Sequence, residues 1–185
     1  MNIDEQHINE LINLCKQGNK NARKTLYEIF SKKMMALCYR YLPNIQDAED
    51  ALCDGFISMY EHLHKYKQGN FTAWLSKIMI NSCLIIIKKQ KKFVLKEDNT
   101  MFDLAEDIEI DNPQRFNKND IIKALESLPN AYRTIFNMAI IDEMKYDEIC
   151  EHLNINKQTV KTVMYRAKKR LREFLINLEE ERNNR

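Results

Sequence analysis

Apolar residues recur every three or four positions along most of this chain, which is the spacing of an amphipathic helix. The spacing fades once, between about residues 93 and 118, and then returns. Only three Gly and three Pro occur in 185 residues, so the chain can build few tight turns, and the alternation typical of strands is missing. The pattern predicts an all-α protein in which two small helical domains, residues 1–92 and 119–185, are joined by a linker, residues 93–118.

The first block is expected to form a four-helix bundle. Gly18, Pro43 and Gly69 interrupt its apolar pattern, and Asn21 is the expected N-cap of the second helix. The four apolar stripes fall within residues 8–15, 26–41, 48–66 and 74–85. In the second block, Pro129 begins a helix whose predicted buried face includes Ile135 and Ile140.

Charge is sorted along the sequence. Residues 88–96 contain five Lys and no acid, residues 97–111 contain seven acids and no base, and residues 157–172 contain seven bases and no acid. Such blocks are typical of interaction surfaces or tails, although each is also compatible with an ordinary solvated face. The acid-rich block, with its weak apolar pattern, predicts a flexible acidic linker.

Residues 146–161 have the anatomy of a helix-turn-helix. A short helix is followed by Asn154, which tolerates a left-handed conformation, and Asn156 is placed to cap a second helix. Polar side chains at the start of that helix, followed by bases, suit the reading of base edges and the gripping of phosphates in a major groove. The alternative is a helical hairpin with a basic exposed helix and no DNA role.

Three segments together resemble one family. Residues 127–129 (SLP), 146–149 (YDEI) and 153–171 (LNINKQTVKTVMYRAKKRL) look like the DNA-binding domain of extracytoplasmic-function (ECF) sigma factors, of the sigma-70 family. Residues 47–56 (DAEDALCDGF) resemble that family's polymerase-binding helix. Residues 71–78 (FTAWLSKI) with Asn81 resemble its −10 promoter-reading segment. The resemblance covers about residues 8–92 and 119–176 and implies a sigma factor that directs RNA polymerase core to promoters for transcription initiation.

The resemblance also implies site residues. Residues 1–92 would be sigma region 2, with carboxylates for the β′ clamp of polymerase at Asp47, Glu49, Asp50 and Asp54. The −10 element would be contacted, or a flipped base captured, by Phe71, Trp74, Lys77, Asn81, Lys88 and Lys89, although Trp74 is expected to be mainly a core residue. Residues 119–185 would be sigma region 4, which binds the −35 element and the β flap, with DNA contacts at Lys157, Gln158, Thr159, Lys161, Thr162, Tyr165, Arg166 and Lys169.

The chain departs from the family at several positions. The family usually has Gln at Cys53, a bulky aliphatic residue at Gly55 and Trp at Tyr60. It often has Ser-Arg where Thr162 and Val163 stand, so one expected DNA contact is lost. The acidic linker is expected either to lie in the basic channels of polymerase or simply to space two basic modules.

Other classes of function find little support in the sequence. The five Cys form no C-x-x-C pair and are expected to be reduced thiols of a cytoplasmic protein without a signal peptide or a membrane-inserted segment. No catalytic residue, metal site or cofactor is expected, so the chain is predicted not to be an enzyme. The family implies control by an anti-sigma factor. The alternative function is that of a stand-alone helix-turn-helix transcriptional regulator, which would bind palindromic DNA as a dimer.

Overall fold

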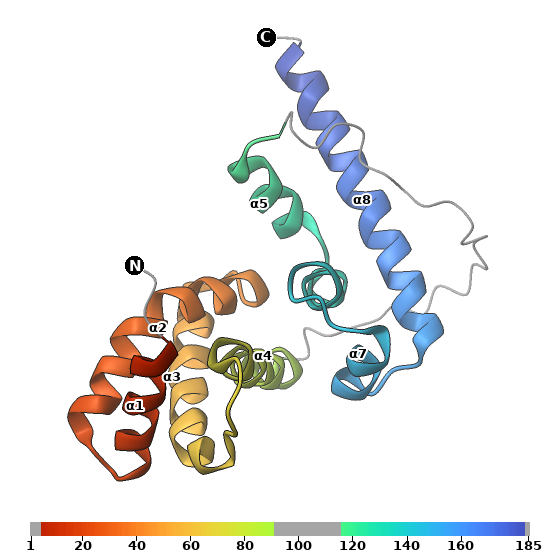
Figure 1. Ribbon diagram of the computed structural model, residues 1–185. Coiled ribbons are helices and arrows are strands. Elements are labelled where there is room, and N and C mark those ends of the chain that lie inside the picture. The colour runs from red at the N-terminus through yellow and green to blue at the C-terminus, as the bar shows by residue number, and fades with distance from the viewer. Residues whose placement is uncertain (1–4, 91–115, 184–185) are drawn as a thin grey trace. The chain divides into compact units, whose positions relative to one another are not determined.

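The computed structural model describes residues 5–90 and 116–183, and every regular element within these ranges is helical (Figure 1). The chain divides into two compact units, Met1–Lys91 and Lys92–Arg185, here called unit 1 and unit 2. The predicted all-α fold with two helical parts is therefore confirmed. The predicted linker lies outside the described residues, apart from its last three positions.

Between residues 5 and 90, unit 1 contains four α-helices, as the apolar stripes predict. The third apolar stripe continues to residue 66, but the α-helix ends at His62 and the chain continues as a 3-10 turn, Leu63–Lys65. The helices are α1 Glu5–Lys16, α2 Lys20–Tyr41, α3 Ile45–His62 and α4 Phe71–Lys89.

Asparagine side chains cap three of these helices. The Asn19 side chain accepts a hydrogen bond from the backbone N–H of Ala22 at 3.1 Å, so the predicted cap Asn21 is wrong. The helix begins earlier because Gly18, at φ +85°, turns the chain back immediately after α1. Asn44 and Asn70 cap α3 and α4 in the same way.

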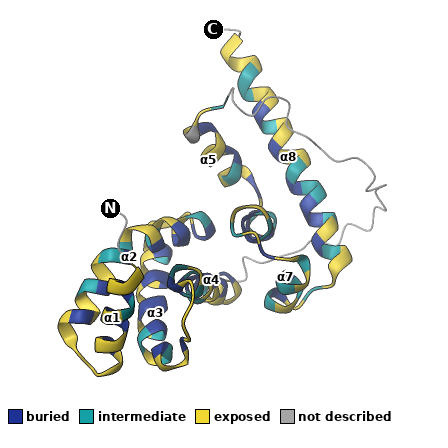
Figure 2. Ribbon diagram, in the orientation of Figure 1, coloured by how far each residue is buried: buried dark blue, intermediate teal, exposed yellow. Residues whose placement is uncertain are grey.

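Helix α4 contributes a large part of the core of unit 1. Among the described residues it is the one helix long and apolar enough, by length and composition, to cross a membrane. Eight of its residues are buried, and it packs against α2 and α3 (Figure 2). At the crossing with α3, a Cβ atom on Gly55 would lie 2.3 Å from the sulfur of Met79. Met79 therefore fills the space that a larger residue at position 55 would need.

Unit 2 is organised around one long helix. Helix α8, Lys157–Asn183, packs against the other α-helices that the structure describes in this unit and extends beyond residue 176, where the resemblance to the family ends. Its buried residues include Ala167, Leu171 and Leu175, which join a core with Ala124 and Leu128. The other helices are α5 Lys118–Ser127, α6 Asn130–Phe136 and α7 Tyr146–Leu153.

A π-helical turn, Asn137–Ile141, follows α6 and changes its buried face. The N–H of Asp142 bonds to the carbonyl of Asn137, five residues back, at 2.9 Å. The wider turn places Met138 in the core, fully buried, while Ile140 is 49% exposed. The prediction that Ile140 is buried is wrong because it assumed a regular helical period.

Candidate polymerase and nucleic-acid interfaces

The helix-turn-helix forms as its local residues predict. Asn154 adopts the left-handed conformation (φ 54°, ψ 50°) and ends α7. The Asn156 side chain then accepts hydrogen bonds from the backbone N–H of Thr159 at 2.7 Å and from its hydroxyl at 2.9 Å. The Thr159 hydroxyl thus helps to hold the start of α8, so its predicted role at DNA competes with a structural one.

The residues predicted for −35 binding lie on the side of α8 that is turned away from the core. Val160, Val163 and Ala167 are buried on its other side. Burial of Val163 fits the absence of the family's Arg at this position. The predicted residues are exposed at Lys157, Gln158, Lys161 and Lys169 and half-buried at Thr159, Thr162, Tyr165 and Arg166.

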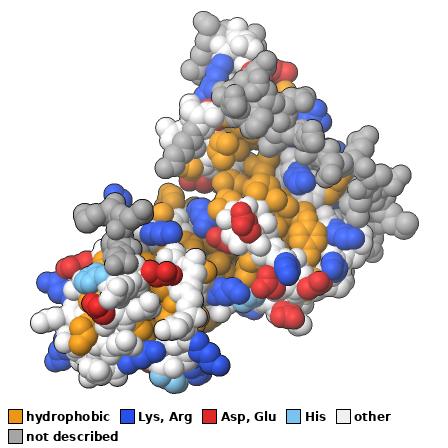
Figure 3. All heavy atoms as spheres, viewed as in Figure 1, with side chains coloured by type: hydrophobic (Ala, Val, Ile, Leu, Met, Phe, Trp, Pro, Cys, Tyr) orange, Lys and Arg blue, Asp and Glu red, His pale blue; other side chains and the backbone are white. Residues whose placement is uncertain are grey.

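Some bases of the block 157–172 already contact other side chains of the protein. The Arg170 guanidinium lies over the ring of Tyr132, 5.4 Å from its centroid. Lys157 donates to both carboxylate oxygens of Asp147, at 2.8 and 3.1 Å. This hydrogen bond raises the pKa of Lys157 above its ordinary value. On the face drawn in Figure 3, acidic side chains lie among the basic ones on both units.

The acidic face of α3 borders a hollow of about 340 Å³. Asp50 and Asp54 are exposed, whereas Asp47 is half-buried and accepts a hydrogen bond from the Gln90 side chain at 2.7 Å. Glu49 is exposed but does not line the hollow. The structure therefore brings three of the four predicted polymerase contacts together, and the full lining is Asp47, Asp50, Cys53, Asp54, Ile86, Lys89 and Gln90.

The residues predicted for −10 binding separate into three environments. Lys77, Asn81 and Lys88 are exposed and follow one another at helical spacing along α4. Lys89, by contrast, lines the hollow beside Asp50 and Asp54, where it faces the predicted polymerase contacts. The aromatic pair, Phe71 and Trp74, lies at the start of α4.

Phe71 is a core residue, 5% exposed, at the centre of an aromatic cluster. Its ring centroid lies 5.2 Å from that of Phe30, 5.2 Å from Tyr66 and 5.6 Å from Trp74, which is half-buried. The Tyr66 hydroxyl donates to the carbonyl of Gly69 and fixes the loop before α4. Sequence reasoning did not assign Phe30 or Tyr66 to the site, although Tyr66 and Phe71 flank the loop that contains Gly69, which is a readable signal.

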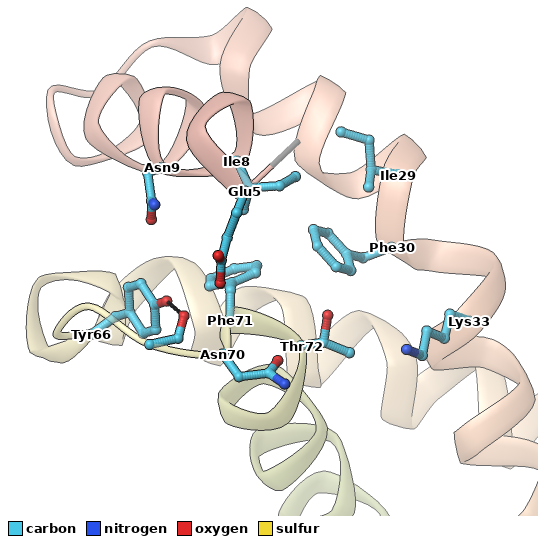
Figure 4. A pocket seen from close by; sticks show the side chains of 11 residues that line it. Glu5, Ile8, Asn9, Ile29, Phe30, Lys33, Tyr66, Asn70, Phe71 and Thr72 are labelled. Atoms are coloured by element: carbon cyan, nitrogen blue, oxygen red, sulfur yellow. Dashed lines mark hydrogen bonds between the residues drawn. The ribbon is translucent and has the colours of Figure 1, made fainter. Parts of the chain in front are cut away.

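A hollow of about 440 Å³ opens beside this cluster, between α1, α2 and the loop before α4. In Figure 4 the Glu5 carboxylate points down between Tyr66 and Phe71, and Lys33 reaches in from α2. Aromatic walls with polar groups at the rim are chemically suited to an unpaired base or a peptide side chain. Within the described ranges, no group of three or more His, Cys, Asp or Glu is placed to hold a metal ion.

Two protein families match the chain in sequence. Sigma-70 region 2 matches residues 26–93, and sigma-70 region 4 matches residues 118–171. The ECF RNA polymerase sigma factor SigW of Bacillus subtilis is 31% identical, over 94% of this chain and all of that protein. The RNA polymerase sigma factor SigV of the same organism is 27% identical, over 85% of this chain and 93% of that protein.

Two solved structures share the fold. One is the sigma factor RpoE in complex with the anti-sigma factor NepR from Bartonella quintana, with a TM-score of 0.53 and 22% identity, covering 82% of this chain and 95% of that one. The other is CnrH in complex with the cytosolic domain of CnrY, with a TM-score of 0.51 and 18% identity, covering 90% and 96%. With regions 2 and 4 matched in order and a relative at 31% identity over 94% of this chain, the chain belongs to the ECF sigma factors of the sigma-70 family.

Proposed function

We propose that this chain is a sigma factor that directs RNA polymerase core to specific promoters for transcription initiation. The observation that carries the proposal is the presence of sigma regions 2 and 4, in that order, in one chain. A stand-alone helix-turn-helix regulator is not favoured, because region 4 alone would serve it and region 2 would have no role. As a sigma factor the chain acts by binding and not by catalysis.

We assign residues 1–92 to polymerase binding and −10 recognition. The α3 face around Asp50 and Asp54 is the proposed contact with the β′ clamp, since its exposed carboxylates surround a hollow that a partner side chain can enter. Lys89 lines the same hollow and is better placed there than at DNA. Lys77 and Asn81 stay the proposed contacts with the opened strand, with Lys88 on the same stripe.

We assign the aromatic cluster a supporting role in base capture. Phe71 is too deeply buried to stack on DNA directly, but it packs against Trp74 and Tyr66, which border the loop. A rigid aromatic support keeps the loop shaped for an unpaired base and lowers the entropy cost of capture. Phe71 therefore acts through its neighbours.

We assign residues 119–185 to the −35 element. The exposed face of α8 presents amide and cationic groups from a capped helix start, the arrangement that reads base edges while gripping phosphates. Two weak contacts on one chain, at −10 and −35, reinforce each other through effective concentration. Such a factor binds promoters well only as part of the polymerase complex.

An anti-sigma factor is the expected regulator. Both structural relatives described above were solved with a partner, and one of these partners is named as an anti-sigma factor. We extend this class of partner to the present chain and place the protein in the cytoplasm with its polymerase. Co-purification of the chain from its native cells, followed by identification of bound proteins, tests the extension.

Run-off transcription with purified core polymerase on genomic DNA tests the function, and mapped start sites would give the promoter sequence. Absence of any initiation would refute the proposal. Replacing Asp50 and Asp54 by Lys should abolish polymerase binding, whereas the same reversal at Glu10 and Glu61, exposed elsewhere on unit 1, should preserve it.

The −35 contacts need a separate test, in which duplex affinity is measured across KCl concentrations. Replacing Lys161 and Arg166 by Ala should weaken promoter binding and reduce its salt dependence by roughly two phosphate contacts. Removing two exposed bases of unit 1, Lys20 and Lys32, is the matched control and should leave the salt dependence nearly unchanged.

A further inference from the structure

One acid reaches across the helix-turn-helix to the first residue of its second helix. Asp147 lies in the first turn of α7, and both its carboxylate oxygens bond to the ammonium of Lys157. The two residues are 53% (Lys157) and 74% (Asp147) exposed, so the pair is formed at the surface, where DNA phosphates would also approach. It joins the two helices directly.

The start of α8 needs such an acid. Lys157 is the first residue of the helix, where the macrodipole disfavours a positive charge, and the first turn contains no acid of its own. Lys161 follows four residues later on the same face, which adds like-charge repulsion. A carboxylate held beside Lys157 offsets both effects.

Asp147 is the acid of α7 that is available for this purpose. Its neighbour Glu148 is already engaged, because its side chain accepts a hydrogen bond from the backbone N–H of Lys145 and closes the capping box of α7 at 3.0 Å. Glu151, one turn further along α7, is exposed and has no ion pair with α8 among the described residues. The contact is therefore specific to one carboxylate.

We propose that Asp147 is a positioning residue that holds Lys157 at the corner of the helix-turn-helix and restrains the grip of unit 2 on DNA. The inference rests on the proposed −35 role of α8. A phosphate that approaches Lys157 must compete with a carboxylate already bound to it and is also repelled by that carboxylate. Lys157 therefore contributes less to phosphate neutralisation than an unpaired lysine would.

The restraint has a use in a protein that acts only with polymerase. Electrostatic contact with phosphates is insensitive to sequence and dominates non-specific binding. Each phosphate contact removed weakens binding to all DNA, whereas base-edge contacts along α8 are retained. Asp147 thus shifts the balance of unit 2 from affinity toward selectivity.

The test measures binding of the full-length chain to a duplex of scrambled sequence by fluorescence anisotropy across KCl concentrations. Asp147→Asn keeps the size of the side chain and removes its charge. Affinity should rise about three- to tenfold at ~50 mM KCl, and the slope of log affinity against log salt should steepen by about 0.9, one additional phosphate contact. Circular dichroism confirms that the variant remains folded.

Glu151→Gln is the matched control, because it makes the same charge change on the same helix without touching Lys157. It should leave the slope unchanged. In a Lys157→Gln background, Asp147→Asn should lose its effect on the slope. An unchanged slope in Asp147→Asn, or an equal effect of Glu151→Gln, would overturn the inference.

These outcomes differ from failure of the proposed function. If the unmodified chain shows no salt-dependent binding to any duplex and supports no run-off transcription, the −35 assignment itself fails. If the unmodified chain binds and initiates while Asp147→Asn behaves like it, only the role of Asp147 is refuted.

Discussion

The two units of the chain stabilise their interiors differently. Among the described residues, unit 1 buries a single polar residue, Ser82, whereas unit 2 buries four, namely Asp120, Arg133, Thr134 and Asn137. Unit 1 thus depends on close apolar packing and on asparagine caps at the helix ends. Unit 2 also buries polar groups, which lower its stability wherever they are left without a hydrogen bond.

The polar contacts of unit 2 connect its short helices to each other and to the long one. Arg182, near the end of α8, pairs with Asp120 of α5 at 2.6 Å. Arg133 donates to the Asn130 side chain at 2.6 Å and, weakly, to the carbonyl of Glu126 at 3.4 Å. A small domain with short helices has a limited apolar core, and such contacts specify one arrangement of its helices at a cost in desolvation.

The comparison predicts that unit 1 is the more sensitive to changes of volume. Gly55→Leu should lower the stability of unit 1 by about 2–3 kcal/mol, because the new side chain overlaps Met79. Amide hydrogen exchange should show reduced protection in unit 1 and unchanged protection in unit 2. The double variant Gly55→Leu/Met79→Ala should lose less stability than the sum of the losses in the two single variants. Strict additivity would contradict the packing explanation.

Unit 2 should gain stability when an unsatisfied polar group is removed. The Thr134 hydroxyl is buried and has no hydrogen-bond partner among the described residues. Thr134→Val keeps the shape and should raise the free energy of unfolding by about 1 kcal/mol in urea denaturation. Thr134→Ser, which keeps the hydroxyl and loses the methyl group, should instead lower it, and a loss of stability in Thr134→Val would contradict the assignment.

Acid should weaken unit 2 through Asp120. Burial alone would raise the pKa of this carboxyl, but hydrogen bonds from Arg182 and from the Asn117 backbone outweigh burial and lower the pKa. A carboxyl whose pKa is lowered by folding stabilises the fold at pH values above its pKa in the unfolded chain, about 3.9. This contribution is lost as the pH falls from there through the lower pKa of the folded state. The stability advantage of the unmodified chain over Asp120→Asn should be constant above about pH 5 and shrink below about pH 4. Glu173→Gln, an exposed control on α8, should show no such shrinkage.

High pH should affect unit 1 through the ionisation of Tyr60. Burial raises the pKa of Tyr60 to about 12, and its hydroxyl donates to the carbonyl of Arg23 at 2.7 Å. An ultraviolet titration of tyrosinate should show late ionisation near pH 12 that decreases by one tyrosine in Tyr60→Phe. Tyr39→Phe, at an exposed position, should leave the late step in place. The measurement detects ionisation directly, so it is informative even when the effect on stability is small.

Local signals in the sequence predicted local structure well. Asn154 and Asn156 were placed correctly because a left-handed turn and a helix cap depend on a few neighbouring residues. The cap of α2 was misplaced by two residues because Asn19 and Asn21 have equal intrinsic preference, and only the turn at Gly18 decides between them.

Features that depend on tertiary contacts were not predictable. The π-helical turn that exposes Ile140 leaves no mark in an apolar pattern read at a fixed period. The pairing of Asp147 with Lys157 joins residues ten positions apart and requires the turn geometry to be known. Within the predicted −10 set, only the structure separates Lys89 from Lys77, because the hollow beside α3 forms from two helices.

Helix α8 spans 27 residues, about 40 Å of continuous rod, and its two ends have different neighbours. One end presents side chains to the proposed DNA site, while the other is fastened to α5 by Arg182. Because α5, α6 and α7 all pack against α8, the orientation of its exposed face is set by the whole length of the helix and not by the helix-turn-helix alone. The core contacts at Leu171 and Leu175 therefore help to fix how the proposed DNA-facing residues are presented.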